Sequence, residues 1–508
     1  MTSTRVVPLH DLLADLPDAL VLGDANPDIT DVVYDSREVT KGALFAALPG
    51  ADFDGHAFIE RAIAAGAATV LCEHPAGATV PQIVVPDSRA ALAVIATAFH
   101  GHPSRELRTI GITGTDGKTT TSFLLEHILT YAGQRAGVIG TVGIRVGNGI
   151  THDLGHQTTP ESNRIQGFLR EMVTNDVDTA VVEATSHGLA MHRLDGVTWD
   201  IAGVTNITHE HLEYHKTIEN YRRAKAILIE RTAANRGVVV LNADDEGARA
   251  MAAWATDAIV RWYSMDGAAA DITATRVVAH NTSTSFALTI DDETFPIELP
   301  MIGGFNVANA LLAAGLAQAA GVAPQTIAAA LHEPVNVPGR MRILDEGQDF
   351  DVVVDYAHTP ESLRKILTLL RSLHPETRLI VVSGSAGERD ATKRPLQGAV
   401  CAELADVAIF TSEDPRNEDP DRIIADIAAG ARETGAVAGQ DFHQITDRTE
   451  AIAKAFALAQ PGDCVLLAGK GHETSIIWGY EHRPWNEAEV AKTLLHKRAT
   501  SMQEVRAS

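Results

Sequence analysis

The sequence predicts an α/β protein of three domains: a small N-terminal α/β domain, a central domain with a phosphate loop (P-loop) on a mostly parallel sheet, and a C-terminal Rossmann-like domain. The chain has 508 residues, which corresponds to roughly three domains of about 150 residues each. From residue 106 onward, short apolar runs alternate with helical patterns, as in sheets with helices on both faces. A Gly-rich turn joins one such run to a helix near residue 115. We therefore expect domains at 1–105, 106–340 and 341–508.

The composition is that of an acidic globular protein. Hydrophobic residues make up 45% of the chain and the formal net charge is −24. Because nucleic acid repels an acidic surface, the charge argues against non-specific nucleic-acid binding, and any nucleotide is expected to be a small ligand in a pocket. The cysteines Cys72, Cys401 and Cys464 are too scattered to suggest a disulfide framework or a Cys-based zinc site. With no apolar leader and no membrane-length apolar run, we expect a cytoplasmic protein. We also expect a monomer.

Apolar runs and helical patterns place the expected secondary structure. In the first domain, strands are expected at 31–34, 43–47, 69–72 and 83–85, and helices at 59–65 and 90–99. In the second, strands are expected at 109–113, 179–183, 201–206 and 238–241, with a β-rich insertion at 265–300 and a helix at 305–320. In the third, strands are expected at 352–355, 379–382, 407–410 and 464–467. Ligands of parallel sheets bind beyond the carboxyl ends of the strands, so residues following these runs are candidate site residues.

The segment Thr109–Thr121 is expected to form a strand, a phosphate loop and a helix start. Backbone N–H groups of such a loop surround polyphosphate oxygens, Lys118 can reach the terminal phosphates, and the Thr119 hydroxyl can ligate Mg²⁺. The match to the general pattern is incomplete, because Ile112 stands where a glycine is expected. A chance Gly-rich turn is the alternative, but Gly114 and the residues after it fall at the strand-to-helix junction where a phosphate loop must lie.

Two further strand ends carry possible metal ligands. Glu183 and His211 could converge with Thr119 on a divalent cation; a carboxylate and a hydroxyl suit Mg²⁺, and a histidine broadens the site toward Mn²⁺. Ordinary hydrogen-bonded structural residues are the alternative. His209, His211 and His215 do not follow the His-Glu-x-x-His spacing and have no cysteine nearby, so a catalytic zinc site is not favoured.

The C-terminal domain has four polar strand ends, at 355–360, 383–390, 413–416 and 469–473. Mixed charges at one edge of a sheet suit a zwitterionic or cationic small molecule, although charged surface loops would give the same pattern. By spacing alone, Lys225 in a helical segment is expected to be solvated surface.

Several motifs together resemble a known family over essentially the whole chain. They are Gly114–Thr121, Glu183–His187, Asn206–His211, Tyr221–Lys225, Asp355–Pro360, Arg389–Pro395 and Gly469–Glu473. In this order they resemble the Mur ligases of peptidoglycan synthesis, and within them the ligases that add a diamino acid to UDP-N-acetylmuramoyl-L-alanyl-D-glutamate. The resemblance implies an N-terminal UDP-sugar-binding domain, a central ATPase and a C-terminal amino-acid-binding domain. Because the three substrates would come from three domains, domain closure is expected.

The resemblance also implies roles for individual residues. The catalytic residues would be Lys118, Lys225 and His211. The ATP contacts would be Gly114, Thr115, Asp116, Gly117, Lys118, Thr119, Thr120, Asn306, Arg340, Asp355 and His358. The UDP-sugar contacts would be Ser36, Thr158, Thr159, Ser186 and Arg193, and the amino-acid contacts Arg389, Asp414, Arg416, Gly469 and Glu473. The metal site would comprise Thr119, Glu183, His211 and Lys225 as its carbamate, a modification that turns a cation into an anion able to help hold a second Mg²⁺.

Three positions depart from the family pattern: Asp116 replaces a common Asn, Met191 stands where some members have Gln, and Glu413-Asp414-Pro415-Arg416 stands where diaminopimelate enzymes typically have Asp-Asn-Pro-Arg. Arg416 could pair with the distal carboxylate of meso-diaminopimelate. Asp414 adds negative charge, which suits the free ammonium of lysine or ornithine. The two signals conflict, and the sequence slightly favours lysine or ornithine.

The expected reaction is ATP-dependent amide formation through an acyl phosphate. Two alternatives stay open at this point. One is another ligase of the superfamily, such as a folylpolyglutamate synthase; the other is a nucleotide-dependent switch that ligates nothing. The four charged strand ends of the last domain favour an enzyme, because a simple switch would not need them.

Overall fold

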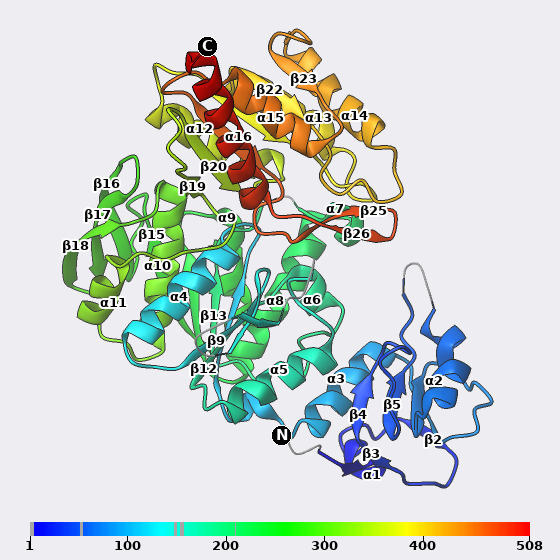
Figure 1. Cartoon of the computed structure of the whole chain (residues 1–508). Coiled ribbons are helices and arrows are strands. Elements are labelled where there is room, and N and C mark those ends of the chain that lie inside the picture. The colour runs from blue at the N-terminus through cyan, green and yellow to red at the C-terminus, as the bar shows by residue number, and fades with distance from the viewer. Residues whose placement is uncertain (1–4, 51–53, 147–149, 153–156, 209, 508) are drawn as a thin grey trace. The chain divides into compact units, whose positions relative to one another are not determined.

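The computed structural model describes residues 5–50, 54–146, 150–152, 157–208 and 210–507. The chain folds into two compact units. The first comprises residues 1–208, 219–272 and 311–327, and the second comprises 209–218, 273–310 and 328–508. Both units combine helices with sheets (Figure 1), which confirms the predicted α/β class. The predicted domain boundaries at 105 and 340 stay predictions.

The first sheet lies near the N-terminus, in strand order β2-β7-β6-β5-β4. The elements of this region are β1 (Val7–Pro8), α1 (Leu9–Leu12), β2 (Leu20–Leu22), β3 (Asp28–Ile29), β4 (Asp31–Val33), β5 (Ala43–Ala46), η1 (Gly55–Phe58), α2 (Ile59–Ala65), β6 (Thr69–Cys72), β7 (Gln82–Val84), α3 (Ser88–Phe99) and η2 (Pro103–Arg105). Strands β1 and β3 pair separately in a two-stranded sheet. Side chains alternate across β5: Leu44 packs in a core with residues of α1 and α3, and Phe45 in a core with residues of α2. Helices therefore cover both faces of this sheet.

The central sheet of the first unit has the strand order β11-β10-β9-β12-β8-β13-β14-β15. Its elements are β8 (Arg108–Thr113), α4 (Lys118–Tyr131), β9 (Ala136–Gly140), β10 (Gly143–Val146), β11 (Ile150–His152), α5 (Ser162–Thr174), β12 (Thr179–Glu183), α6 (Ser186–Ala190), β13 (Ile201–Val204), α8 (Ile218–Ala234), β14 (Val238–Asn242), α9 (Glu246–Ala250), η3 (Met251–Trp254) and β15 (Ile259–Ser264). Strand β8 pairs in parallel with β12 and β13. The carboxyl ends of these three strands therefore lie side by side.

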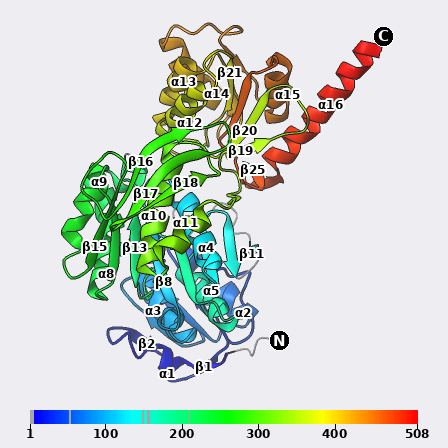
Figure 2. The same cartoon turned by 90° about the vertical axis from the view of Figure 1, so that its left-hand side faces the viewer.

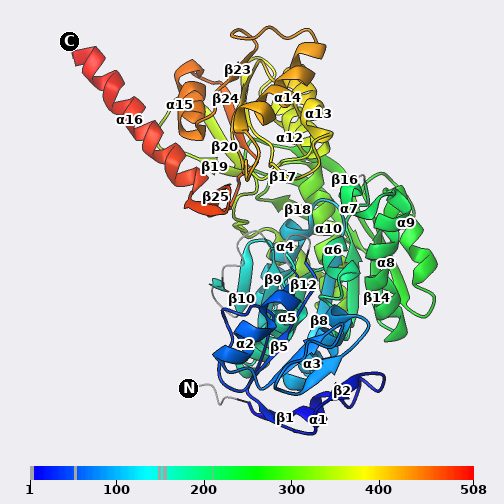
Figure 3. The same cartoon turned by 90° about the vertical axis from the view of Figure 1, so that its right-hand side faces the viewer.

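The C-terminal sheet of the second unit has the strand order β19-β20-β24-β21-β22-β23 and is parallel except for β19. The elements here are β19 (Arg342–Leu344), β20 (Asp351–Asp355), α12 (Pro360–Leu373), β21 (Leu379–Ser383), α13 (Lys393–Leu404), β22 (Val407–Phe410), α14 (Pro420–Glu433), β23 (Phe442–Gln444), α15 (Arg448–Leu458), β24 (Cys464–Ala468), β25 (Ser475–Trp478), β26 (Glu481–Pro484) and α16 (Glu487–Ala507). One face packs on α12, α13 and α14, the other on α15 and the start of α16, whose far end runs away from the sheet (Figures 2 and 3). This is the predicted doubly wound arrangement.

The remaining elements are α7 (Leu212–His215), β16 (Ile272–Ala279), β17 (Thr284–Ile290), β18 (Glu293–Leu299), α10 (Gly304–Ala319) and α11 (Pro324–Leu331). Strands β17 and β18 form an antiparallel hairpin, which confirms the predicted β-rich insertion. The strand predicted at 201–206 was too long: β13 ends at Val204, because Asn206 instead binds the backbone of the phosphate loop. The hairpin of β9 and β10 was not predicted, since its three glycines hide the strand pattern.

None of the helices that the structure describes combines the length and the apolarity needed to cross a bilayer. All three cysteines are buried as free thiols. Burial raises the pKa of Cys72, and it raises the pKa values of Cys401 and Cys464 to about 12.

Candidate active site

The loop between β8 and α4 turns on two glycines. Gly114 and Gly117 have φ angles of 147° and 87°, a region that side chains rarely adopt. At Gly114 a Cβ atom would also lie 1.8 Å from Thr205 Oγ1. The Lys118 Nζ atom donates hydrogen bonds to the carbonyl oxygens of Gly114 and Thr115 at 2.9 and 2.8 Å. The loop therefore needs glycine where the sequence predicts it, and it holds Lys118 against its own backbone.

Asn206, just beyond β13, fixes the loop from the neighbouring strand. Its carbonyl oxygen accepts from Thr115 N at 2.8 Å, and its side-chain Oδ1 accepts from Asp116 N at 3.0 Å. The Thr115 hydroxyl lies 3.0 Å from the Tyr221 hydroxyl of α8. The loop is thus anchored by two elements before any ligand is considered.

Lys225 lies in the interior and not on the surface. It is 1% exposed, and its Nζ atom donates to the Gly114 carbonyl oxygen at 2.7 Å. The same Nζ atom lies 4.5 Å from the centre of the Tyr221 ring, a cation–π contact. The expectation from spacing alone, a solvated lysine, is therefore wrong. Helix α8 carries this side chain under the phosphate loop.

Glu183 ends β12 and is fully buried. One of its carboxylate oxygens accepts from Thr119 Oγ1 at 3.0 Å and from Thr141 Oγ1 at 2.9 Å, and the other accepts from Thr141 N at 3.1 Å. Thr119 and Glu183, predicted from separate motifs, are therefore hydrogen-bonded. Burying a carboxylate is costly, and these donors offset the cost. A hard divalent cation fits this donor set, because it prefers oxygen ligands and negative charge.

The residues expected to hold the UDP-sugar extend from this cluster. Thr158 Oγ1 lies 3.0 Å from Thr141 Oγ1, and Thr159 Oγ1 donates to the Glu183 carbonyl oxygen at 2.9 Å. Arg193 donates to the Thr159 carbonyl oxygen at 3.0 Å. Hydrogen-bonded hydroxyl groups thus run from Glu183 toward the half-buried Arg193.

Two other members of this set lie on separate elements. Ser186 is buried at the start of α6, where Thr185 caps the helix. Ser36 is half-buried in the turn after β4.

In the second unit, Lys470 lies between two predicted amino-acid contacts. It is fully buried and donates to Asp414 Oδ1 at 2.8 Å and to Glu473 Oε2. Asp414 Oδ1 also accepts from Ile477 N at 3.0 Å, and Glu473 Oε1 accepts from the Tyr356 hydroxyl at 3.2 Å. The Glu473 and Asp414 carboxylates outweigh the loss of hydration and raise the pKa of Lys470. One ammonium therefore balances two carboxylates.

Glu413 adds a third carboxyl group beside this pair. It is 6% exposed, its Oε2 atom has no hydrogen-bond partner, and burial raises its pKa. A Cβ atom on Gly469 would lie 2.9 Å from this Oε2, and Gly469 has a φ of 104°. Arg416 has a φ of 53°, and its buried Nε atom has no hydrogen-bond partner. A carboxylate oxygen and a guanidinium nitrogen without hydrogen-bond partners thus lie near one edge of the sheet, and such a pair suits a zwitterionic ligand.

The expected ATP contacts of the second unit lie near β20. The Arg340 Cζ atom lies 4.5 Å from the centre of the Tyr356 ring. The Asp355 carboxylate accepts hydrogen bonds from the backbone N–H groups of Met341 and Ala357 at 2.8 and 2.7 Å. Burial lowers the pKa of His358 to about 4, and the Lys393 ammonium acts in the same direction. On α10, the Asn306 side chain donates to the Ile302 carbonyl oxygen at 2.9 Å.

Family models and full-length relatives match this chain. Models of the Mur ligase family match residues 28–100 (catalytic domain), 112–317 (middle domain) and 339–471 (glutamate ligase domain). The chain is 44% identical to a UDP-N-acetylmuramyl-tripeptide synthetase of Roseiflexus sp. over 96% of this chain and 98% of that protein. It is 42% identical to a UDP-N-acetylmuramoyl-L-alanyl-D-glutamate–2,6-diaminopimelate ligase of Bacillus licheniformis, over 92% and 95%.

The chain belongs to the Mur ligase family. Mur ligases are ATP-dependent ligases, so the chain is an enzyme. A solved structure of a UDP-N-acetylmuramoyl-L-alanyl-D-glutamate–2,6-diaminopimelate ligase is 31% identical and matches 97% of this chain and 99% of that chain with a TM-score of 0.66. The three-domain α/β Mur ligase architecture predicted from the sequence is thereby confirmed.

Within this Mur ligase, the structure brings some of the predicted site residues together and leaves others on separate segments. Thr119 with Glu183, Lys118 with Lys225, and Asp414 with Glu473 share partners or bond directly. His211 belongs to the second unit, with a φ of 54° and its Nε2 atom 3.9 Å from Glu210 Oε2. Arg389 lies exposed on the loop after β21. His209 lies outside the described residues.

Two residues that hold the Mur ligase site together were not predicted. Thr141 follows β9, a strand that the glycines concealed, although its place at a strand end would have been the signal. Lys470 lies inside a predicted motif, but its burial is not visible from the sequence.

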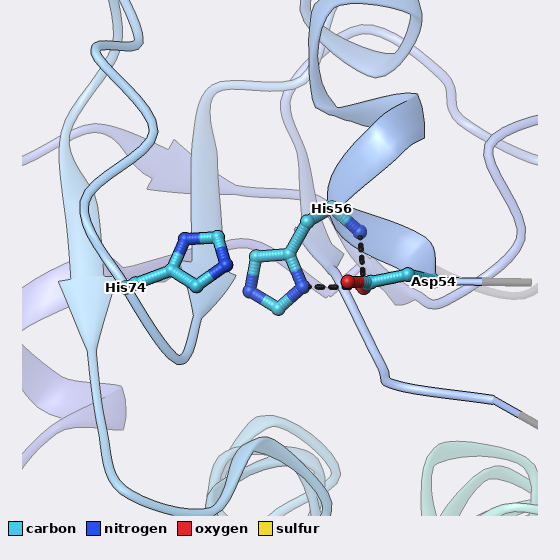
Figure 4. Close-up of side chains that lie close together, drawn as sticks. All are labelled: Asp54, His56 and His74. Atoms are coloured by element: carbon cyan, nitrogen blue, oxygen red, sulfur yellow. Dashed lines mark hydrogen bonds and ion pairs between the residues drawn. The ribbon is translucent and has the colours of Figure 1, made fainter.

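A separate group of Asp54, His56 and His74 has its potential ligand atoms within 4.8 Å of one another (Figure 4). His56 Nδ1 lies 2.6 Å from Asp54 Oδ1, and His56 Nε2 accepts from Glu73 N at 2.9 Å. Both ring nitrogens are therefore engaged by the protein, and a metal ion would have to displace one bond. The His74 ring packs against His56 with the centroids 4.2 Å apart. This group ties the start of η1 to the end of β6 in the N-terminal sheet.

Proposed function

We propose that the protein joins a diamino acid to UDP-N-acetylmuramoyl-L-alanyl-D-glutamate, with ATP as the second substrate, in peptidoglycan-precursor synthesis. The observation that carries the proposal is the convergence of Lys118 and buried Lys225 on the phosphate loop beside the Thr119–Glu183 pair. The names of the full-length relatives support the same substrate. An acidic chain suits small anionic nucleotides held at such a local cationic site better than it suits nucleic acid. We place the reaction in the cytoplasm and take the enzyme to be a monomer.

In the first step, an oxygen of the D-glutamate γ-carboxylate attacks the γ-phosphorus of ATP, the bond to the bridging oxygen breaks, and ADP leaves. An acyl phosphate remains. In the second step, the α-amine of the diamino acid attacks the acyl carbonyl, phosphate leaves and the nitrogen loses a proton. Two anions meet in the first step, so Lys118 and the loop N–H groups act by positioning and by neutralising charge.

We propose Mg²⁺ as the metal, held by Thr119, Glu183 and His211. The oxygen donors and burial of Glu183 fit a hard cation. When bound, Mg²⁺ supplies positive charge beside the transferred phosphoryl group. Lys225 as a carbamate would add a further anionic ligand. A carbamate nitrogen retains one N–H, which could still donate to the Gly114 carbonyl oxygen that Lys225 now contacts.

The remaining predicted contacts divide between the other substrates. Ser36, Thr158, Thr159, Ser186 and Arg193 are proposed to hold the UDP-sugar, and Asn306, Arg340, Asp355 and His358 to contact ATP together with Gly114–Thr120. Arg389, Asp414, Arg416, Gly469 and Glu473 are proposed to hold the amino acid. Closure of the domains would then bring the three substrates together.

For the third amino acid we favour lysine or ornithine. Glu413, Asp414 and Glu473 place three carboxyl groups around one buried ammonium, that of Lys470, and this excess suits an added ammonium. Meso-diaminopimelate is the second candidate, supported by the cation of Arg416, whose Nε atom has no partner. The named diaminopimelate ligases among the relatives support it too.

The experiment is phosphate release from ATP with UDP-muramoyl-L-alanyl-D-glutamate and a panel of lysine, ornithine and meso-diaminopimelate. We expect release that requires both the sugar nucleotide and one diamino acid. A folate acceptor tests the folylpolyglutamate synthase alternative. Absence of release with every acceptor would leave the nucleotide switch and contradict the proposal.

A further inference from the structure

Arg448 is a buried arginine at the carboxyl ends of two strands of the C-terminal sheet. It begins α15 and is 2% exposed. Its Nη2 atom donates to the carbonyl oxygen of Ala468, the last residue of β24, at 2.7 Å. Its Nη1 atom donates to the carbonyl oxygen of Ser412, two residues after β22, at 3.3 Å. One guanidinium therefore bridges the points where two chain segments leave the sheet.

A buried carboxylate neutralises this guanidinium. Glu487 is fully buried and accepts from Arg448 Nη2 at 2.6 Å and from Nε at 3.0 and 3.1 Å. Its Oε2 atom also accepts from the Trp485 indole at 2.7 Å. Desolvation offsets much of the attraction within a buried ion pair, whereas removal of one partner leaves a buried charge uncompensated.

The two bridged segments continue directly into the proposed amino-acid pocket. Ser412 precedes Glu413–Arg416, and Ala468 precedes Gly469–Glu473. Their side chains meet where Lys470 contacts Asp414 and Glu473. The distance between the two segments where they leave the sheet therefore sets how these charges face an incoming amino acid.

We propose that Arg448 is a positioning residue that holds the two halves of the amino-acid pocket at the separation the diamino acid requires. The inference rests on the proposed function of that pocket. Arginine suits the task because its planar fork binds a carboxylate on one edge while other N–H groups reach two carbonyl oxygens. A lysine would keep the charge facing Glu487 but lose that fixed geometry.

The structure offers a matched control at the opposite end of the same sheet. Arg378 precedes β21, donates to the Leu458 carbonyl oxygen at 2.7 Å and pairs with Asp463, just before β24, at 2.6 Å. It makes a similar carbonyl-and-carboxylate set where no substrate is proposed, with a side chain that is 35% exposed against 1% for Arg448. Arg378→Lys therefore reports the general cost of losing such a link.

The test compares Arg448→Lys with Arg378→Lys in the full chain, by the KM for each substrate, by kcat and by the melting temperature. For Arg448→Lys we expect the KM for the diamino acid to rise about tenfold, with kcat and the other two KM values within about twofold of the wild type. Arg378→Lys should leave all three KM values unchanged. An unchanged amino-acid KM in Arg448→Lys, or an equal rise of all three, overturns the proposal.

If Arg448→Lys does not fold, Glu487→Asp decides, because it keeps the negative charge that faces the buried guanidinium while its shorter side chain loosens the hold on Arg448. A rise of about threefold in the amino-acid KM alone supports the proposal, and no change contradicts it. Wild-type phosphate release with a diamino acid tests the proposed function separately. A wild type that ligates while the variants keep its KM values would overturn only the role of Arg448.

Discussion

Lys118 and Lys225 donate hydrogen bonds to the same backbone oxygen, that of Gly114, at 2.9 and 2.7 Å. One lysine comes from the start of α4 and the other from the second turn of α8, more than a hundred residues away. Lys118 brings a cation to the loop that is proposed to bind the ATP phosphates, and Lys225 would bring an anion to the same loop once carbamoylated. Loss of either lysine should therefore impair phosphoryl transfer.

Lys118→Ala should abolish turnover, with a loss of roughly 10³-fold in kcat, because a positioned cation is lost from the phosphoryl-transfer site. The melting temperature should stay close to that of the wild type, since Lys118 is only partly buried. Phosphate-release kinetics and thermal melting check this. An active variant would refute the phosphate-loop assignment.

Lys225→Ala should lose about 10²-fold in activity and regain part of it when short carboxylates are added, because they can replace the carbamate. The same assay with and without added bicarbonate should show a dependence in the wild type. Lys225→Arg, which retains a cation but cannot form this carbamate, is the matched control and should not respond. Full activity of Lys225→Ala without rescue would count against the carbamate.

Glu183→Gln should raise the Mg²⁺ concentration needed for half-maximal activity by about tenfold, since the anionic oxygen next to Thr119 is lost. A Mg²⁺ titration of phosphate release measures this. Glu126→Gln is the control: Glu126 is also buried in the first unit, but it pairs with Arg145 at 3.2 Å. Equal Mg²⁺ requirements in the two variants would argue against Glu183 as a ligand.

Asp414→Asn should shift the preference between amino acids toward meso-diaminopimelate, because it removes one negative charge from the Lys470 cluster. We expect the ratio of kcat/KM for lysine or ornithine to that for meso-diaminopimelate to fall about tenfold, or about 1.4 kcal/mol. Competition assays with both amino acids measure the ratio directly. A ratio that does not move would remove the support that Asp414 gives to a cationic substrate.

His358 should make the C-terminal sheet less stable in acid. Its pKa is lowered to about 4 in the fold, against an ordinary value of 6.5, so the unfolded chain binds more protons between these values. The free energy of unfolding therefore falls as the pH drops from about 6.5 to about 4, by on the order of 3 kcal/mol for this group. His358→Gln should flatten that dependence in denaturant titrations at several pH values, while His10→Gln, at an exposed site, should not.

The strands and the phosphate loop could be predicted because their signals are local. Short apolar runs mark β4 to β7, and Gly114, Gly117, Lys118 and Thr119 mark a strand-to-helix turn within a few residues. The roles of Lys225 and Lys470 depend on tertiary burial instead. Periodicity places a helical lysine on the surface, whereas the packing of α8 under the loop buries it.

The links between segments were the part that the sequence concealed. Arg448 lies in no predicted motif, because its partners Ser412, Ala468 and Glu487 are far from it along the chain and two of them offer only backbone oxygens. Every residue has a backbone carbonyl oxygen, so the residue type does not reveal which of these oxygens accepts a hydrogen bond. Thr141 was missed for a different reason, since glycines obscure the pattern of β9, the strand that precedes it.

Because the three native thiols are buried, we expect maleimides not to label the native protein. Cys401 and Cys464 have pKa values of about 12, so almost no thiolate exists there at neutral pH, and Cys72 is enclosed as well. Cysteines introduced at exposed Tyr131 and Tyr480, one in each compact unit, would therefore take a donor and an acceptor dye without removing any native residue that reacts. A change in energy transfer between the dyes as nucleotide and amino acid are added would report domain closure directly.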